Sequence, residues 1–289
     1  MFATKIAILG QGAREAALAW KLTQDVGSEN IFVLPGNDGM SWRTGIDCTD
    51  FSAVAAFCHD KKIDLVVVGP ENLLAAGCVD FLREQGLNVF GPTQIASRLE
   101  SSKMEARAFM KRHRVAIPVS HEFQNLAEMR SLALYMQGNC VIKFDGLAAG
   151  KGVFVCHNMN EVSAAYNELQ EQYGEFCAGL VEERLEGVEV SLIAVTDGLA
   201  MRVLPAAQDH KRLLDEDLGP NTGGMGAFSP VPWLNVEILK TIDQDIVQPT
   251  LLGIKSEGYD YRGFLYFGVM LTKKGPKLIE YNVRFGDPE

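Results

Sequence analysis

The sequence predicts an α/β fold: an N-terminal doubly wound parallel sheet, then a small α+β lid and a larger, mainly antiparallel α+β subdomain. Over the first hundred residues, short apolar runs alternate with helix-like segments, which is typical of a parallel sheet covered by helices. Around Gly146, a glycine-rich stretch joins two strand-like segments. Further along, Asp197-Gly198 is a strong hairpin signal between two apolar runs. These observations divide the chain into its three predicted parts.

The composition is that of an ordinary globular protein, with 289 residues, 47% hydrophobic and 22% charged. The charge is 27 − 37 = −10, which excludes a general positively charged surface for nucleic acid. The six cysteines have no C-x-x-C spacing, and the five histidines have no metal-ligand spacing. No segment resembles a signal peptide or approaches the roughly 20 apolar residues that span a bilayer. We therefore expect a cytoplasmic protein that binds neither nucleic acid nor membranes.

The first domain is expected to cover residues 1–100. Its predicted strands lie at 5–10, 31–36, 64–70 and 87–92, and its predicted helices at 14–24, 52–62 and 72–85. Ser52 is the expected N-cap of the second helix. A basic helix that begins at Ser101 is expected to connect this domain, over 101–118, to the rest of the chain.

Two further units are expected, a lid over 119–187 and a larger subdomain over 188–289. The lid is predicted to contain strands at 140–144, 152–156 and 179–185 and a helix at 161–172. The larger subdomain is predicted to contain a hairpin from Val188 across Asp197-Gly198, a helix at 235–257, and a hairpin of 264–271 with 277–285. The polar, glycine-rich stretch 209–230 reads as a loop, and loops of this length are usually functional or mobile.

The turn from Gly10 to Arg14 is the first candidate site. It follows a strand and opens a helix, so its backbone N–H groups can hold an anion. The third glycine of a G-x-G-x-x-G motif is absent, because Glu15 takes its place, and the second strand carries no acidic residue at its end. The pattern therefore does not favour an NAD site. An anion site and a ligand-free turn fit the two glycines equally well.

The second candidate is the segment from Lys143 to Gly152. A P-loop requires G-x-x-x-x-G-K-[ST] and a following helix, whereas this segment has a shorter glycine spacing and is followed by a strand. A strand–loop–strand flap over a triphosphate fits better, with Lys143 and Lys151 neutralising phosphate oxygens. The alternative is a flexible hairpin, which does not explain why two lysines flank the glycines.

The third candidate is the acidic segment 181–191. A strand edge here can bind an adenine through its backbone, and Glu189 can accept a hydrogen bond from a ribose hydroxyl. Strand alternation places Glu183 and Leu185 on one face. Composition alone favours the alternative, a solvated acidic hairpin.

The fourth candidate lies near the end of the chain, where period two places Glu280 and Asn282 on one face of a strand. Both side chains offer the oxygen ligands that Mg²⁺ prefers in nucleotide sites. Arg284 continues this face and can stabilise the charge of a transferring phosphoryl group. The alternative is an exposed strand face, which three polar residues on an otherwise apolar strand make a poorer explanation.

Three segments together resemble the phosphoribosylamine–glycine ligases, ATP-grasp enzymes of purine biosynthesis: KFDGLAAGKGV, QDHKRLLDEDLGPNTGGMGAFSP and EYNVRFGDPE. The segment FGPTQIASRLESSKMEARAFM is similar to the start of that family's ATP-grasp module, and the resemblance covers the whole chain. It implies that the lid and the larger subdomain form an ATP-grasp module. It also implies a reaction in which ATP phosphorylates glycine and 5-phosphoribosylamine attacks the glycyl phosphate, giving glycinamide ribonucleotide, ADP and phosphate.

The resemblance also implies roles for individual residues. For ATP it implies phosphate contacts from Lys103 and Lys143, a flap containing Asp145, Gly146, Gly150, Lys151 and Gly152, an adenine side with Glu182, Glu183 and Leu185, and a ribose contact from Glu189. It implies Mg²⁺, or Mn²⁺ in its place, on Glu280 and Asn282. It assigns catalysis to Arg284, Lys143 and Lys151.

For the two other substrates, glycine and 5-phosphoribosylamine, the implied residues are Gly10, Gly12, Arg14, Asp209, Lys211, Arg212, Asn221, Gly223, Gly224 and Asp287. The chain departs from the family at Ala16, where a histidine is usual, and near Gly268, where many ATP-grasp relatives carry another acidic metal ligand. Family members continue beyond Glu289, so we expect this chain to lack a C-terminal domain. We expect a monomer or weak homo-oligomer. Two alternatives remain, another ATP-grasp carboxylate–amine ligase and a nucleotide-binding module without turnover.

Overall fold

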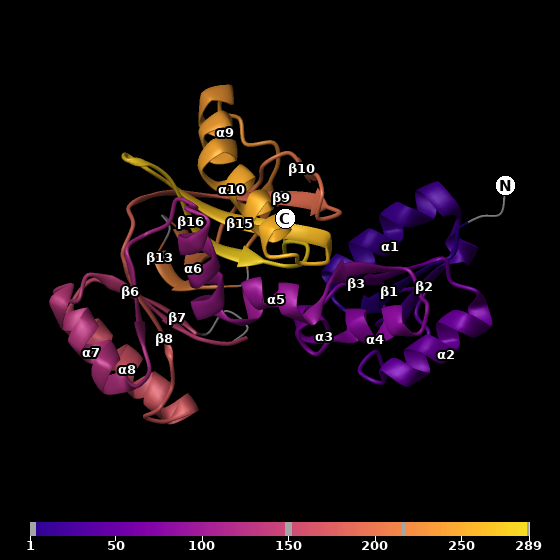
Figure 1. The fold of residues 1–289 in the computed structure, drawn as a ribbon, viewed down its shortest axis with the longest axis horizontal. Coiled ribbons are helices and arrows are strands. Elements are labelled where there is room, and N and C mark those ends of the chain that lie inside the picture. Colours follow the sequence, from indigo (N-terminus) through magenta and orange to yellow (C-terminus); the bar gives the residue numbers. More distant parts are fainter. Residues whose placement is uncertain (1–3, 148–151, 216–217, 223, 288) are drawn as a thin grey trace.

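The computed structural model describes residues 4–147, 152–215, 218–222, 224–287 and 289. Figure 1 shows the N-terminal domain, drawn in indigo and purple, at one end of the molecule and the lid at the other, with the larger subdomain between them. The predicted parallel N-terminal sheet, the α+β lid and the antiparallel larger subdomain are confirmed.

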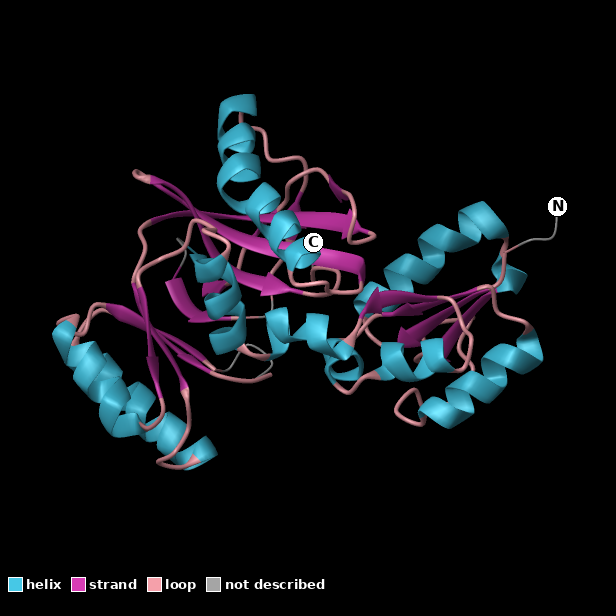
Figure 2. Cartoon of the chain, viewed as in Figure 1, coloured by secondary structure: helices cyan, strands magenta, loops and turns pink. Residues whose placement is uncertain are grey.

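The N-terminal domain is built on four parallel strands, in the spatial order β2-β1-β3-β4. These are β1 (Ile6–Gly10), β2 (Ile31–Pro35), β3 (Leu65–Val68) and β4 (Val89–Pro92). The strands are almost wholly apolar because helices cover both faces of the sheet (Figure 2). The covering helices are α1 (Ala13–Val26), α2 (Phe51–Lys61), α3 (Glu71–Ala75) and α4 (Cys78–Glu84), and a 3₁₀ turn spans Ser28–Asn30.

Two details of this domain differ from the prediction. The side chain of Asp50, and not that of Ser52, caps α2, because it accepts a hydrogen bond from the backbone N–H of Ala53. The helix predicted over 72–85 is broken into α3 and α4. The break falls at Gly77, whose φ of 82° lies in the left-handed region that a continuing helix cannot use.

The connection to the rest of the chain is also two helices, α5 (Gln94–Ser101) and α6 (Lys103–Arg112), where the sequence predicted a single helix from Ser101. Ser102 separates them with an extended backbone, and its hydroxyl accepts a hydrogen bond from the N–H of Glu105. This N-cap places the first turn of α6, with Lys103, beside the lid. In Figure 1, α5 lies between the N-terminal domain and the remaining parts.

The lid is a four-stranded antiparallel sheet in the order β5-β8-β6-β7. Its strands are β5 (Ser120–Phe123), β6 (Cys140–Phe144), β7 (Val153–Cys156) and β8 (Gly179–Glu183). The helices α7 (Leu126–Tyr135) and α8 (Met159–Tyr173) pack against one face and close a separate hydrophobic core (Figure 1). The strand predicted over 179–185 ends at Glu183, so Leu185 lies beyond the observed strand β8.

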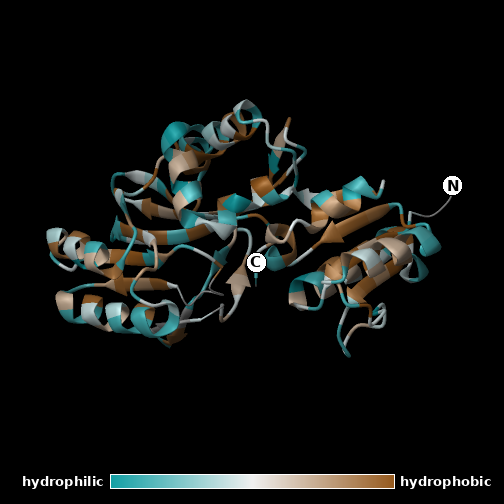
Figure 3. Cartoon of the chain, turned by 60° about the horizontal axis from the view of Figure 1, so that its bottom comes forward, coloured by the Kyte–Doolittle hydropathy of each residue, from teal (hydrophilic) through white to brown (hydrophobic). Residues whose placement is uncertain are grey.

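The larger subdomain continues the N-terminal sheet, because β15 (Tyr261–Thr272) pairs antiparallel with β4. On its other side β15 pairs with β9 (Gly187–Thr196), which turns at Asp197-Gly198 into β10 (Met201–Val203). The final strand β16 (Gly275–Asn282) forms the predicted hairpin with β15. One hydrophobic cluster therefore extends from the N-terminal sheet into this subdomain, and Figure 3 shows apolar residues concentrated along its strands.

The predicted helix over 235–257 is present as α9 (Val236–Ile242), a π-helical turn (Asp243–Val247) and α10 (Gln248–Ser256). Pro249 is tolerated because it lies in the first turn of α10. The predicted loop 209–230 contains two short strand pairs, β11 (Gln208–Asp209) with β14 (Ala227–Phe228) and β12 (Arg212–Leu214) with β13 (Leu218–Asn221). No helix in the described part of the chain is long and apolar enough to cross a membrane.

Candidate functional site: a charged cavity between the lid and the larger subdomain

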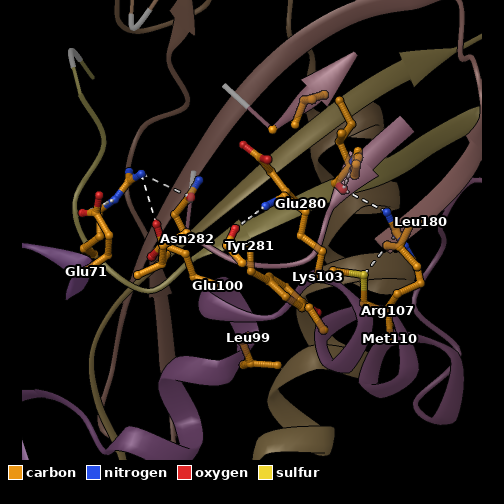
Figure 4. A pocket seen from close by; sticks show the side chains of 18 residues that line it. Glu71, Leu99, Glu100, Lys103, Arg107, Met110, Leu180, Glu280, Tyr281 and Asn282 are labelled. Carbon is orange, nitrogen blue, oxygen red and sulfur yellow. Dashed lines mark hydrogen bonds and ion pairs between the residues drawn. The ribbon is translucent and has the colours of Figure 1, made fainter. Parts of the chain in front are cut away.

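A cavity lies where α5, α6, the lid sheet and β16 meet (Figure 4). The lid contributes Lys143, Gly146, Gly152 and Leu180, and β16 contributes Glu280 and Asn282. Its other charged residues are Glu71, Glu100, Lys103, Arg107 and Arg284. The cavity thus brings together residues that are far apart in the sequence, from the N-terminal domain to the end of the chain.

Glu280 is the carboxylate of β16 at this cavity. It lies opposite Gly268 in the β15–β16 pair, where a side chain would crowd it, since a Cβ on Gly268 would be 3.2 Å from the Glu280 Cγ. Burial by itself would raise the pKa of Glu280, but Lys211, Lys143, Lys103 and Arg284 together keep it below its usual value. Glu280 is therefore a carboxylate that stays charged inside a cationic site.

Two lysines lie near enough to this carboxylate to lower its pKa. Lys103, in the first turn of α6, donates from Nζ to the carbonyl oxygen of Gly146 at 2.9 Å. Lys143, on β6, donates from Nζ to the carbonyl oxygen of Ile279 at 3.0 Å. Burial lowers the pKa of Lys103, which Glu280 partly offsets. The pair places two cationic side chains in the lining of the cavity, where an anion could bind.

The sequence predicts that Arg284 continues the strand face of Glu280 and Asn282. In the structure Arg284 lies just past the end of β16, so strand alternation does not set its position. Its guanidinium donates to Asn282 Oδ1 at 3.2 Å and forms ion pairs with Glu100 at 3.2 Å and Glu71 at 3.5 Å. Burial alone would lower the pKa of Arg284, but these carboxylates raise it overall. Figure 4 shows Glu71, Glu100 and Asn282 on one side of the cavity.

Glu182 forms buried ion pairs with two cations, an arrangement that the sequence did not predict. Its Oε2 lies 3.0 Å from Lys143 Nζ, and its Oε1 lies 2.5 Å from the Nη2 atom of Arg107. Burial opposes its charge, but the two cations lower the pKa of Glu182. The carboxylate is therefore engaged by the protein, so any adenine contact at this position would come from the backbone of β8. Glu183 and Leu185 do not line the described cavity.

Asp145 and Gly146 follow β6 at the base of the predicted flap. The Asp145 carboxylate accepts hydrogen bonds from the Ser102 hydroxyl at 3.1 Å and from the Met104 N–H at 3.0 Å. It therefore anchors the start of the flap to the N-terminus of α6 instead of pointing at a ligand. Gly152 also lines the cavity, whereas the predicted residues Gly150, Lys151 and Gly223 lie outside the described residues.

A second cluster adjoins the cavity on β9, β11 and β15. Glu189 forms an ion pair with Lys211, and Lys211 is close enough to Glu280 to lower its pKa. Burial raises the pKa of Asp209 to about 6. The sequence analysis missed three members of this cluster: the buried Ser191 hydroxyl lies 2.7 Å from the Tyr266 hydroxyl and donates to Glu289 Oε1 at 2.6 Å. Strand alternation from Glu189 would have pointed to Ser191.

Arg212 and Asn221 are register partners of the β12–β13 pair, close in the sequence to Lys211. The N–H of Gly224 donates to the Thr222 hydroxyl at 3.1 Å, which fixes the turn that follows β13. The segment 209–230 thus supports the predicted substrate residues through short strand pairs instead of an open loop.

At the N-terminal turn, Glu15 occupies the position expected for an anion. Its Oε2 accepts a hydrogen bond from the Gly12 N–H at 2.6 Å, and Gly10, with φ 130°, leaves room for this side chain. Gly10 and Gly12 therefore pack around a buried carboxylate. Arg14 points the other way, to Glu71 at 3.2 Å and to the carbonyl oxygen of Phe285 at 3.3 Å, with Asp287 at 3.9 Å.

Within the described residues, no group of three or more His, Cys, Asp or Glu side chains forms a metal site. A divalent cation at Glu280 and Asn282 would therefore complete its shell with phosphate oxygens and water, as Mg²⁺ commonly does. The surrounding lysines and Arg284 suit a polyphosphate in the same place. The donor set thus fits a Mg²⁺–nucleotide pair better than a metal ion alone.

Two family models match nearly the whole chain. The N domain of phosphoribosylglycinamide synthetase matches residues 4–100, and its ATP-grasp (A) domain matches residues 101–289. The sequence is 44% identical to a phosphoribosylamine–glycine ligase of Mesorhizobium japonicum, across 98% of this chain and 68% of that protein.

The sequence is also 44% identical to the trifunctional purine biosynthetic protein adenosine-3 of Gallus gallus, across 99% of this chain. The chain spans 30% of the length of that relative. Among solved structures, phosphoribosylamine–glycine ligase of Thermotoga maritima superposes with a TM-score of 0.85 at 34% identity, covering 99% of this chain and 70% of that one.

Proposed function

The chain belongs to the phosphoribosylglycinamide synthetase family, and we propose that it ligates glycine to 5-phosphoribosylamine with conversion of ATP to ADP and phosphate. In this reaction the glycine carboxylate attacks the γ-phosphate of ATP, which forms glycyl phosphate and releases ADP. The amine of 5-phosphoribosylamine then attacks the glycyl carbonyl, phosphate leaves, and the amine loses a proton. The product is glycinamide ribonucleotide.

One observation carries the proposal: in a chain of net charge −10, Glu280 lies in a cavity surrounded by Lys103, Lys143 and Arg284. The lysines would hold nucleotide phosphates, and Glu280 with Asn282 would hold Mg²⁺. When bound, Mg²⁺ would neutralise charge on the phosphates as one of them is transferred. Arg284, positioned by Glu71 and Glu100, would stabilise the same developing charge.

The second cluster would hold the other substrates. Lys211 adjoins Glu280 and Asp209 lies near Lys211, so both would contact glycine, while Arg14 would contact the phosphate of 5-phosphoribosylamine. Because the Glu15 carboxylate accepts the hydrogen bond from the Gly12 N–H, we assign that phosphate to the Arg14 side chain and not to the glycine turn. We further propose that the enzyme works in the cytoplasm on small molecules, without nucleic acid or membrane, as a monomer or weak homo-oligomer.

Product formation tests this proposal. The purified protein is incubated with Mg²⁺, ATP, 5-phosphoribosylamine and isotope-labelled glycine, and ADP release is followed together with the mass of the labelled product. We expect glycine, but not alanine or serine, to stimulate ADP release, and the label to appear in glycinamide ribonucleotide. If the protein binds nucleotide but glycine does not stimulate ADP release, the ligase assignment is refuted and the protein is a nucleotide-binding module without turnover.

A further inference from the structure

Arg107 is a buried charged residue in the wall of the cavity that the proposed reaction does not use. It extends from α6 and is 2% exposed. Its Nη2 contacts Glu182 at 2.5 Å and donates to the carbonyl oxygen of Ile279 at 3.0 Å, while Nη1 donates to the carbonyl oxygen of Leu278 at 3.3 Å. Arg107 therefore joins α6 to the lid strand β8 and to β16. Burying an arginine costs free energy unless its charge is paired and its N–H groups are hydrogen-bonded.

Arg107 and Lys143 share two partners, Glu182 and the carbonyl oxygen of Ile279. Lys143 contacts the second oxygen of Glu182 at 3.0 Å and donates to the same carbonyl oxygen of Ile279, also at 3.0 Å. The four residues thus form a closed ring of two cations, one carboxylate and one carbonyl. The next residue after Ile279 is Glu280, so this ring lies directly beside the proposed metal ligand.

The charges of the ring decide what it can bind. Arg107 and Lys143 carry two positive charges and Glu182 carries one negative charge, which leaves a surplus of one positive charge. Glu182 is ionised, because its two cations keep its pKa below the usual value. Without Arg107, Lys143 and Glu182 would form a neutral pair. In a buried site such a change alters the attraction for an anion far more than it would in water.

We propose that Arg107 is a positioning residue of the nucleotide site, which neutralises Glu182 and so leaves the charge of Lys143 available to a phosphate oxygen. The proposal rests on the nucleotide-binding part of the proposed function. It differs from a role in which Arg107 merely fastens the lid to the larger subdomain. In that case the loss of Arg107 would reduce stability, and a compensating loss of charge at Glu182 would not restore nucleotide binding.

The dissociation constant of Mg·ADP, measured by isothermal titration calorimetry without glycine, separates the two roles. We expect Arg107→Met to weaken binding about tenfold or more, because Lys143 then pairs fully with Glu182. The double variant Arg107→Met/Glu182→Gln restores the surplus charge, so it should recover most of the lost affinity. A double variant that binds no better than Arg107→Met would overturn the proposal.

Two further variants complete the experiment. Arg112→Met removes an exposed arginine of the same helix, which pairs with Glu257, and should leave the dissociation constant unchanged. Arg107→Lys keeps the charge but loses the fork of donors, and should bind within about threefold of the original protein even where Arg107→Met folds poorly. Weakening by Arg107→Lys as large as that by Arg107→Met would overturn the charge argument.

The same measurements separate failure of this proposal from failure of the proposed function. If the original protein binds no Mg·ADP, the proposed function fails too. If the original protein binds Mg·ADP and Arg107→Met leaves the dissociation constant unchanged, only the role of Arg107 is overturned.

Discussion

Arg284 Nε lies 3.5 Å from Oε2 of Glu71, an ion pair that joins the segment after β16 to helix α3 of the N-terminal domain. Arg14 Nη2 contacts the same oxygen at 3.2 Å. One carboxylate thus holds two arginines from opposite ends of the chain. Burial raises the pKa of Glu71, but a hydrogen bond from its own backbone and the two arginines lower it overall. The proposed phosphoribosylamine side and the nucleotide cavity meet at this residue.

Replacing Glu71 should therefore impair turnover more than nucleotide binding. In Glu71→Ala both arginines lose their shared partner, and we expect kcat to fall about 10- to 100-fold, since misplaced charge at a reacting phosphoryl group costs this much. The affinity for Mg·ADP should change less than threefold, because Lys103 and Lys143 keep their partners. Steady-state kinetics and calorimetry measure both quantities. Glu84→Ala, on the exposed side of α4, is the matched control, and an unchanged kcat in Glu71→Ala would refute the coupling.

Replacing Glu280 should remove the metal-dependent step. Glu280→Gln keeps the shape but loses the charge that a divalent cation requires, so we expect kcat to fall at least about 100-fold. A titration of activity with Mg²⁺ should show that excess metal does not restore it. Glu237→Gln, at an exposed position of α9, should behave like the original protein. Full recovery of Glu280→Gln at high Mg²⁺ would mean that the cation is held elsewhere.

The raised pKa of Asp209 predicts a dependence of activity on pH. With a pKa of about 6, Asp209 is charged at neutral pH and becomes protonated in mildly acidic solution. If its carboxylate contacts the glycine ammonium, kcat/KM for glycine should decline as the pH falls through about 6. Asp209→Asn should have a lower but flatter profile between pH 5 and 7. A profile that keeps its inflection in this variant would assign it to another group.

The raised pKa of Asp209 also affects stability, but here the favourable contribution is lost as the pH rises, whereas activity is lost as the pH falls. Because the folded-state pKa is raised from 3.8 to about 6, the folded protein binds this proton more readily than the unfolded chain. The stabilisation is complete below pH 3.8 and is lost as the pH rises through about 6. Urea unfolding between pH 4 and 7 should show a free energy of unfolding that declines less with pH in Asp209→Asn than in the original protein.

Packing of α10 against α6 predicts a cost at Gly253. A Cβ on this residue would lie 2.5 Å from Phe109 Cζ and 2.7 Å from the His113 ring, and Phe109 is fully buried. Gly253→Ala should therefore destabilise the protein by about 1–3 kcal/mol through overpacking, although alanine favours helices. Gly258→Ala is unsuitable as a control because the φ of Gly258 is 67°, whereas Leu252→Ala shortens an exposed side chain of α10 and is suitable. Thermal unfolding compares the variants, and equal stability would contradict the close approach.

Much of the fold follows from local patterns. The parallel strands, the hairpin at Asp197-Gly198 and the β15–β16 hairpin are encoded by apolar runs between glycines, and the structure confirms them. The helix break at Gly77 was missed because the flanking residues favour helix, and helix α5, which precedes Ser102, was not predicted. Strand alternation correctly predicted that Glu280 and Asn282 line one cavity. Arg284 lines the same cavity, but it follows the last residue of β16, so its position depends on the path of the backbone after the strand.

Long-range ion pairs were beyond what the sequence can show. Glu182 lies in an acidic segment that suggests a solvated hairpin, yet it is buried because Arg107 and Lys143 reach it from two other elements. Glu15 likewise fills the turn that the sequence offered to an anion. Spacing along the chain describes one element at a time, whereas each of these partners comes from a different element or from the far side of a turn.

The position of the nucleotide is measured most directly by a crystal structure of the protein with Mg²⁺ and a non-hydrolysable ATP analogue. We expect the phosphates to lie between Lys103 and Lys143, with Mg²⁺ bound to Glu280 and Asn282. A nucleotide bound outside the cavity, or a metal ion that does not touch Glu280, would contradict the assignment of this cavity as the site of ATP-dependent ligation.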